Sequence, residues 1–414
     1  MEAAANVKKR LSTTVVTPLN PIQKPFVSLG ILVSIILFTV IVMTVSWTQG
    51  ALFVIGLALG LTLLHARFGF TSAFRRLTSV GNVQGLQAHL SMLAVATILF
   101  GIILATGFSF SGNTPAGYVF PIGVSVVFGS FIFGIGMQLG NGCASGTLYN
   151  VGGGNAPLFL TLIGFIVGST IGALHFPWWT SEAMPSLGAI SLAETTGFGY
   201  VGGVLFQLAI FAGLYGITVQ IARKKNPPSM KPLPTTTGIK KLFRGSWPLL
   251  VAAIVLAVLN ALTLAVRGNP WGITSAFALW GSKVLMFFGV DVSSWGYWAG
   301  RTQQLTDSVL FDSTSVMNFG IILGAFIAAT SQGTFKLKAF TPGVTMAALI
   351  GGVLMGYGAR LAFGCNIGAY FGGIASMSLH GWVWMIMALA GTYLALFIRP
   401  LFGLSNPSPK DSIC

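Results

Sequence analysis

Long apolar runs, separated by short polar or basic stretches, dominate this sequence. Several of them reach the roughly 20 residues that an α-helix needs to cross a bilayer. The pattern predicts about ten spans, near residues 28-46, 50-66, 88-109, 119-139, 157-176, 198-221, 247-266, 315-330, 343-361 and 381-398. The run 276-290 is shorter and contains Lys283, so we expect a partial or re-entrant helix there.

The composition agrees with this pattern. Charged residues make up 7% of the chain and hydrophobic residues 54%, with a mean hydropathy of +0.83. Since a soluble domain averages about 25% charged residues, the fold class is expected to be an all-α integral membrane protein. The net charge of +15 does not indicate nucleic acid, because the basic residues lie between spans. The lipid bilayer is the expected partner of these residues.

Two glycine-flanked cysteines interrupt apolar runs at matching places in the chain. The stretch 133-146 recurs as 355-368, which aligns Gly142-Cys143 with Gly364-Cys365. A second echo lies upstream, where residues 69-74 recur as residues 272-277. Paired broken helices in corresponding halves of a membrane protein indicate a transport site at mid-membrane.

The residues after each cysteine, 144-155 and 366-378, are too short and too rich in glycine to cross a membrane alone. We therefore expect a re-entrant short helix after the Gly-Cys motif of each half. Helices starting near Ala144 and Asn366 would aim free amides and their positive dipole ends at the two breaks. Two such ends meeting at mid-depth form an anion site, whereas the alternative is tight packing by small residues.

The charges predict the orientation. A cytoplasmic N-terminus places most basic residues on one side, as the positive-inside rule requires. These residues are Lys8, Lys9, Arg10, Lys24, Arg67, Arg75, Arg76, Arg223, Lys224, Lys225, Lys231, Lys240, Lys241, Arg244, Lys336, Lys338, Arg399 and Lys410. The acidic residues Glu182, Glu194, Asp291, Asp307 and Asp312 fall outside. We predict a multi-pass protein of the plasma (inner) membrane with both termini cytoplasmic.

This orientation makes the two halves inverted repeats, because the first begins outside and the second inside. The predicted division is an N-terminus with an extra first span (1-49), a first repeat (50-222), a basic, proline-rich linker (223-246), a second repeat (247-400) and a short tail (401-414).

The thiols of Cys143 and Cys365 are the candidate transfer groups. In apolar surroundings a thiol stays neutral, and a neutral S–H is a weak donor and a soft partner for sulfur or selenium. Such groups can pass an anion onward without trapping it, as conduction requires. For a single cysteine, burial as a small hydrophobe would be the simpler interpretation.

Polar residues beside the breaks complete the candidate site. Arg360, at the position of Gln138, would attract an anion or pair with backbone carbonyls at the break. Asn141 and Asn366 could donate amide hydrogens to oxyanion oxygens or cap the short helices. Thr71, Ser72, Thr274 and Ser275 occupy the repeated short loops, as caps or as pore lining. Lys283 and Arg301 lie near the external face, where snorkelling is the simpler role.

Other chemistries have no support in the sequence. Three cysteines in 414 residues do not make a disulfide framework, and the four histidines have no metal-ligand spacing. No nucleotide-binding loop, catalytic triad or pair of carboxylates is visible. We therefore expect no metal, no cofactor and no enzymatic activity.

These residues resemble the YeeE/YedE family of sulfur-transport membrane proteins over about residues 50 to 400. The motifs that carry the resemblance are Gly-Cys-Ala-Ser-Gly-Thr at 142-147, Gly-Ile-Thr-Ser at 272-275 and the run from Gly351 to Asn366. The stretch from Gly358 to His380 is closest to the YedE-like branch. The resemblance implies thiosulfate uptake from an external concavity along membrane-embedded thiols, and a cytoplasmic sulfur acceptor of the TusA type.

One position departs from the family pattern. The family commonly has Arg-Phe-Cys-x-Thr in its first short loop, whereas this chain has Arg67-Phe68-Gly69-Phe70-Thr71. Gly69 therefore replaces an inner cysteine, which leaves open a different substrate, another donor or lower selectivity.

The sequence predicts a permease for thiosulfate or a related small sulfur-containing anion. Its predicted permeation residues are Cys143, Cys365, Gly142, Gly364, Asn141, Asn366 and Arg360, with possible inner-loop contacts at Gly69, Thr71, Thr274 and Ser275. The alternatives are transport of selenium species, a sulfur-transfer or redox enzyme, and a membrane scaffold with packing cysteines.

Overall fold

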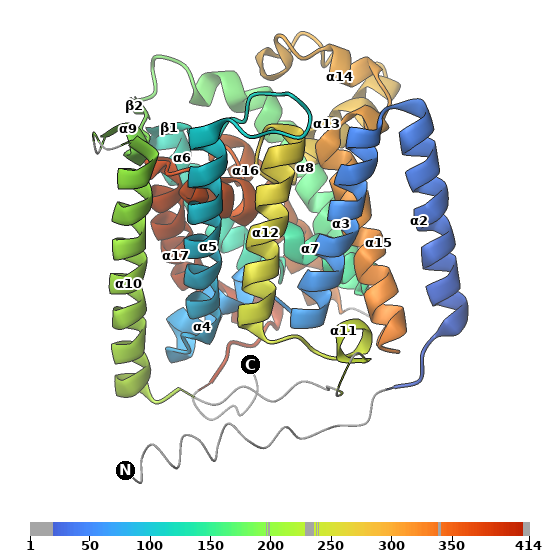
Figure 1. The fold of residues 1–414 in the computed structure, drawn as a ribbon, viewed down its shortest axis with the longest axis horizontal. Coiled ribbons are helices and arrows are strands. Elements are labelled where there is room, and N and C mark those ends of the chain that lie inside the picture. The colour runs from blue at the N-terminus through green and yellow to red at the C-terminus, as the bar shows by residue number, and fades with distance from the viewer. Residues whose placement is uncertain are drawn as a thin grey trace.

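A computed structural model describes residues 20–195, 197, 199–227, 236, 238, 240–337 and 341–408 (Figure 1). Within these residues it contains ten helices that are long and apolar enough to cross a membrane. The predicted all-α membrane class is therefore confirmed. The basic residues Lys8, Lys9, Arg10, Lys231, Lys338 and Lys410 lie outside the described residues.

The long helices follow the predicted spans closely. They are α2 (Lys24–Thr44), α3 (Trp47–Ala66), α5 (Gln84–Thr106), α6 (Val124–Leu139), α8 (Ala156–Trp179), α10 (Gly199–Lys225), α12 (Leu249–Arg267), α15 (Ser313–Ser331), α16 (Pro342–Leu361) and α17 (Leu379–Ile398). Local chemistry sets several of their ends. Asp312 caps α15 by accepting a hydrogen bond from the Ser315 amide at 2.8 Å, and Pro342 opens α16 at a position that needs no amide.

Shorter elements fill the interior and the two ends. Interior pieces are α4 (Phe70–Val80), α7 (Ala144–Gly152), α13 (Thr274–Phe287) and η3 (Asn366–Gly373). End pieces are α9 (Leu192–Thr195), α11 (Lys240–Arg244), η1 (Gly296–Trp298), α14 (Gln303–Thr306), η2 (Val309–Phe311), η4 (Arg399–Phe402) and the antiparallel strands β1 (Pro121–Gly123) and β2 (Ser186–Ala189). The strands pair Pro121 with Ala189 and Gly123 with Ser186.

The long helices pack in matching pairs. α8 packs on α16 and α6 on α17, while α3 packs on α15 and α5 on α12. The peripheral helices follow the same pattern, because the contact of α2 with α15 has a counterpart in the contact of α10 with α5. Two copies related by a two-fold axis would give paired contacts of this kind. The inverted repeats and their boundaries remain predictions.

Glycine allows the closest of these contacts. A Cβ atom at Gly60 would overlap the carbonyl oxygen of Ile321, across the α3–α15 interface. A Cβ at Gly168 would overlap the carbonyl oxygen of Val353, across the α8–α16 interface. Small residues let membrane helices approach in this way, and the approach fixes the frame that holds the site.

The short helices after the cysteines lie inside this frame. In Figure 1, α7 lies at mid-height between the long helices, with α4 and α11 near the lower end and α13 and α14 near the upper end. η3 is a π-helix, in which the Tyr370 amide reaches back to the Cys365 carbonyl at 3.3 Å. The sequence does not reveal this winding, which in other proteins often marks a functional site.

Candidate permeation site

Each of the two cysteines caps the short helix that follows it. The Gly146 amide donates to the Cys143 sulfur at 3.4 Å, and the Ile367 amide donates to the Cys365 sulfur at 3.4 Å. The first helical turn leaves backbone amides without partners, and here a sulfur atom accepts one of them. The breaks therefore place both sulfurs at positive helix ends.

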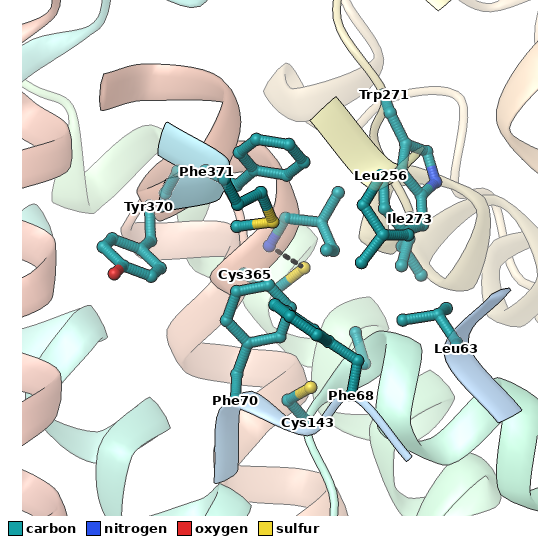
Figure 2. Packing of buried hydrophobic residues seen from close by; sticks show 14 of the residues in the cluster. Leu63, Phe68, Phe70, Cys143, Leu256, Trp271, Ile273, Cys365, Tyr370 and Phe371 are labelled. Atoms are coloured by element: carbon teal, nitrogen blue, oxygen red, sulfur yellow. Dashed lines mark hydrogen bonds between the residues drawn. The ribbon is translucent and has the colours of Figure 1, made fainter. Parts of the chain in front are cut away.

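Both thiols are buried in one apolar cluster. Cys143 and Cys365 are each 1% exposed, and neither is in a disulfide. Helices α7 and η3 contact one another, and Figure 2 shows the two sulfurs on the same cluster with Phe68 and Phe70 beside them. Ile273, which Figure 2 draws beside Leu256 and Trp271, belongs to the same cluster.

A cavity of about 480 Å³ is lined by Gly364 and Gly368, which flank Cys365 in the sequence. We call it the outer cavity, following the predicted orientation. It is lined by Gly117, Tyr118, Phe120, Phe176, Arg267, Asn269, Gly272, Ile273, Thr274, Ser275, Tyr297, Arg301, Arg360, Phe363, Gly364 and Gly368. Three of these described residues are arginines and none is Asp or Glu. The cavity therefore favours anions.

Arg360 is held at the wall of the outer cavity by two hydroxyl groups. Its Nη1 donates to the Tyr297 hydroxyl at 2.5 Å and its Nη2 to the Thr274 hydroxyl at 2.6 Å. Its Nε is buried without a hydrogen-bond partner among the described residues. Of the two roles left open for Arg360, pairing with backbone carbonyls at the break is not what these hydrogen bonds show. The two hydrogen bonds of Arg360 use two of the five N–H groups of its guanidinium.

Two further arginines enter the outer cavity from elements that the sequence analysis did not connect. Arg301, expected to snorkel, packs 4.7 Å from the centre of the Tyr297 ring and donates to the Tyr297 carbonyl at 2.7 Å. Arg267 was missed. It ends α12, and its buried Nη1 has no partner among the described residues. The signal in the sequence was a basic residue directly after the predicted span 247-266, on the side opposite to most basic residues.

Tyr118 adds a neutral donor to the same wall. Its hydroxyl donates to the Pro270 carbonyl at 2.8 Å, and it belongs to the loop between α5 and β1. Burial raises the pKa of Tyr118, so the phenol stays protonated and adds no negative charge to the cavity.

A second cavity, of about 300 Å³, lies at the opposite end, where α3, α7 and α15 end near α11 (Figure 1). We call it the inner cavity. It is lined by Leu64, Arg67, Tyr149, Asn150, Gly153, Asn155, Ala329, Gln332 and Thr334. Its described lining also lacks Asp and Glu, and Arg67 is its one cation. Gly368 of η3 lines the outer cavity and Tyr149 of α7 lines the inner cavity, so each cavity is lined by one of the two short helices that follow the cysteines.

The two predicted asparagines have different surroundings. Asn366, the first residue of η3, is fully buried, and both its Oδ1 and its Nδ2 lack a partner among the described residues. Asn141 is exposed, has φ of 55°, and accepts a hydrogen bond from Arg75 at 3.0 Å. Because a buried amide without partners is costly, Asn366 is the better candidate for a ligand contact.

The remaining predicted residues shape the breaks and the loops. Gly364, at φ of 155°, lines the outer cavity, while Gly142 is buried beside Leu158. The Thr71 carbonyl accepts from Gln138 at 3.1 Å, which matches the bond between Arg360 and Thr274 in the other half. Ser275 lines the outer cavity and donates to Thr314 at 3.1 Å.

Comparison with known proteins identifies the family. Residues 65–394 match the model of a family described as sulphur transport. The chain belongs to this sulphur transport family. The matched residues include both cysteines and every arginine of the two cavities.

Three relatives show how far the similarity extends. The thiosulfate transporter TsuA of Escherichia coli (strain K12) is 26% identical over 358 residues, which are 83% of this chain and 94% of that protein. TsuA of Spirochaeta thermophila is 27% identical, over 83% of this chain and 97% of that protein. The probable transporter YedE of E. coli (strain K12) is 35% identical over 169 residues, 40% of this chain and 42% of that protein. Family and relatives confirm a membrane transport protein, not an enzyme.

The departure from the family pattern at Gly69 has a clear structural setting. A Cβ atom at Gly69 would lie 2.8 Å from the Ser72 hydroxyl and 3.8 Å from the Tyr149 hydroxyl. The Ser72 hydroxyl donates to the Gly69 carbonyl at 3.0 Å and can rotate away. This member of the sulphur transport family therefore has room for a side chain at residue 69.

Proposed function

We propose that this protein takes up thiosulfate, or a related small sulfur-containing anion, from the outer cavity along Cys365 and then Cys143 to the inner cavity. One observation carries the proposal. Two buried free thiols, each at the positive end of a short helix, belong to one cluster, and each of these short helices lines a cavity without described acidic lining. The substrate printed in the names of the two TsuA relatives supports thiosulfate.

The arginines, Asn366 and the thiols each make a different contact with the anion. Arg360, with Arg267 and Arg301, attracts the anion into the outer cavity, where guanidinium N–H groups meet the oxyanion. Asn366 donates to an oxygen at the level of Cys365. The neutral S–H groups then bind the terminal sulfur of the anion weakly, so that it can move on.

The orientation and the partner follow from the same proposal. The halves are inverted repeats in the plasma (inner) membrane, both termini are cytoplasmic, and the inner cavity opens toward the cytoplasm. The released anion passes to a cytoplasmic acceptor of the TusA type. The basic residues around the inner end, such as Lys225 and Arg244, suit anionic lipid or an acidic partner surface.

The test is uptake of labelled thiosulfate into proteoliposomes by the wild type, Cys143→Ser and Cys365→Ser. We expect each variant to lose at least tenfold in rate, because serine keeps the size but loses the soft sulfur. Cys414→Ser, outside the predicted route, serves as the control. Unchanged uptake by both variants would favour the scaffold with packing cysteines.

Two further readouts test transport of selenium species and sulfur-transfer chemistry. Labelled selenite is offered in the same assay, and a faster rate than that of thiosulfate would shift the substrate assignment. Mass analysis of Cys143 and Cys365 during turnover detects persulfides. A persulfide that forms and decays with turnover would replace permeation by sulfur transfer.

A further inference from the structure

A line of polar groups continues from Cys143 along helix α7. The Ser145 hydroxyl lies 3.4 Å from the Cys143 sulfur, and Ser145 is fully buried. Tyr149 follows Ser145 by one helical turn, so their Cβ atoms are about 5–6 Å apart on the same face. Tyr149 lines the inner cavity. Thiol, hydroxyl and phenol therefore succeed one another from the centre of the protein to the inner end.

The end of this line meets a cation. Arg67 lines the same cavity as Tyr149, and Asn150 lines it too. Arg67 caps α3 in the left-handed conformation, with φ of 47°, and its side chain is exposed. A phenol and a guanidinium offer hydrogen bonds to oxyanion oxygens, and neither contributes negative charge at neutral pH.

The other half has no equivalent line. Aligning the two Gly-Cys motifs places Ile367 at the position of Ser145 and Phe371 at the position of Tyr149. Both side chains are fully buried and apolar. The polar line is thus a feature of the inner half alone.

We propose that Ser145 and Tyr149 carry the anion from Cys143 and that Tyr149 and Arg67 form an inner anion-binding site from which it is released. This inference rests on the proposed function. The Tyr149 hydroxyl supplies the hydrogen bond that a side chain at residue 69 would otherwise supply, since a Cβ atom at residue 69 would lie 3.8 Å from that hydroxyl. The lining of the inner cavity has one arginine, which is exposed, against three arginines in the outer cavity, so the inner site holds an anion more weakly.

The test compares thiosulfate uptake by Tyr149→Phe and by a matched control, Tyr393→Phe, whose side chain is exposed on α17. We expect Tyr149→Phe to lower the maximal rate about fivefold with little change in KM, because substrate capture occurs in the outer cavity. The control keeps the wild-type rate. Thermal melting of each variant checks that the fold is retained.

A second variant tests whether Tyr149 acts as a hydrogen-bond donor, because rescue by another donor would not be expected if Tyr149 only supported the fold. Adding Gly69→Cys to Tyr149→Phe places a thiol where the phenol donated, and we expect at least half of the wild-type rate to return. Arg67→Gln is expected to lower the maximal rate about threefold, with Arg223→Gln as its charge-matched control.

The outcomes separate the two proposals. Uptake that is absent in the wild type contradicts the proposed function itself. Uptake that is present in the wild type and unchanged in Tyr149→Phe and Arg67→Gln overturns only the inner site. A slow Tyr149→Phe that Gly69→Cys does not restore also overturns the role of Tyr149 as a donor.

Discussion

The outer and inner halves of the candidate route follow one plan with different chemistry. Each has a thiol at the start of a short helix, a threonine loop and a cavity without described acidic lining. The outer half has three arginines, whereas the inner half has Gln138 at the position of Arg360 and one arginine in its cavity. Since conduction requires capture that is strong enough and release that is easy, the halves are suited to opposite tasks.

The two halves differ most clearly at Arg360, whose side chain is held by two hydroxyl groups. Arg360 is fixed by Thr274 and Tyr297, and its buried Nε has no hydrogen-bond partner among the described residues. Gln138 instead uses its amide to hold the Thr71 carbonyl and the Thr392 hydroxyl. A hydrogen bond to a charged group contributes about 1.5–3 kcal/mol, so on the proposed route we expect Arg360 to bind the anion more strongly than Gln138 does.

The largest effect on uptake is expected when Arg360 of the outer half is replaced by glutamine, the residue at the matching position of the inner half. Arg360→Gln should raise the KM for thiosulfate at least tenfold and leave the maximal rate nearly unchanged, because about 1.4 kcal/mol corresponds to a factor of ten. Arg360→Lys keeps the charge but loses the planar guanidinium group, so its KM should lie between the values of the wild type and of Arg360→Gln. Initial rates of uptake over a range of concentrations measure both, with Arg223→Gln as control. An unaltered KM would remove the role of Arg360 in capture.

The second effect separates two asparagines that flank the same kind of break. Asn366→Ala should lower kcat/KM about fivefold, because it removes a neutral hydrogen bond worth about 1 kcal/mol. It should not destabilise the fold, since the Asn366 amide has no described partner. Asn141→Gly, which tolerates the positive φ, should change uptake less than about twofold. Equal losses in both variants would contradict the assignment.

The smallest effect concerns salt on each side of the membrane. Ions screen exposed charges over about 10 Å at 0.1 M and about 3 Å at 1 M. Added salt on the side of the outer cavity should raise KM about threefold, and on the side of the inner cavity less than about 1.5-fold. The measurement uses vesicles in which the protein is inserted in one direction. A larger effect on the inner side would reverse the proposed direction of capture.

Much of the fold could be predicted because its causes are local. A run of about 20 apolar residues specifies a membrane helix wherever it occurs, and the ten predicted spans have counterparts in the structure. The glycines before Cys143 and Cys365 break the preceding helices, and a short helix starts immediately after each cysteine. The sequence also placed Arg360 correctly beside the second break.

The side-chain surroundings could not be predicted because distant segments create them. Tyr297 comes from the segment between α13 and α15, and only folding brings its hydroxyl to Arg360, 63 residues away. Asn141 and Asn366 look alike in sequence, but a bond to Arg75, 66 residues away, engages the first. Arg267 follows the predicted span 247-266, and residues from distant segments, such as Tyr118 and Tyr297, line the outer cavity with it.

The most direct test is an experimental structure of the protein soaked in thiosulfate, with anomalous scattering to locate sulfur. We predict thiosulfate with its terminal sulfur within about 4 Å of the Cys365 or Cys143 sulfur and an oxygen near the Asn366 amide. Thiosulfate found only in a passage that avoids both thiols, while Cys143 and Cys365 stay packed against apolar side chains, would contradict the proposed route.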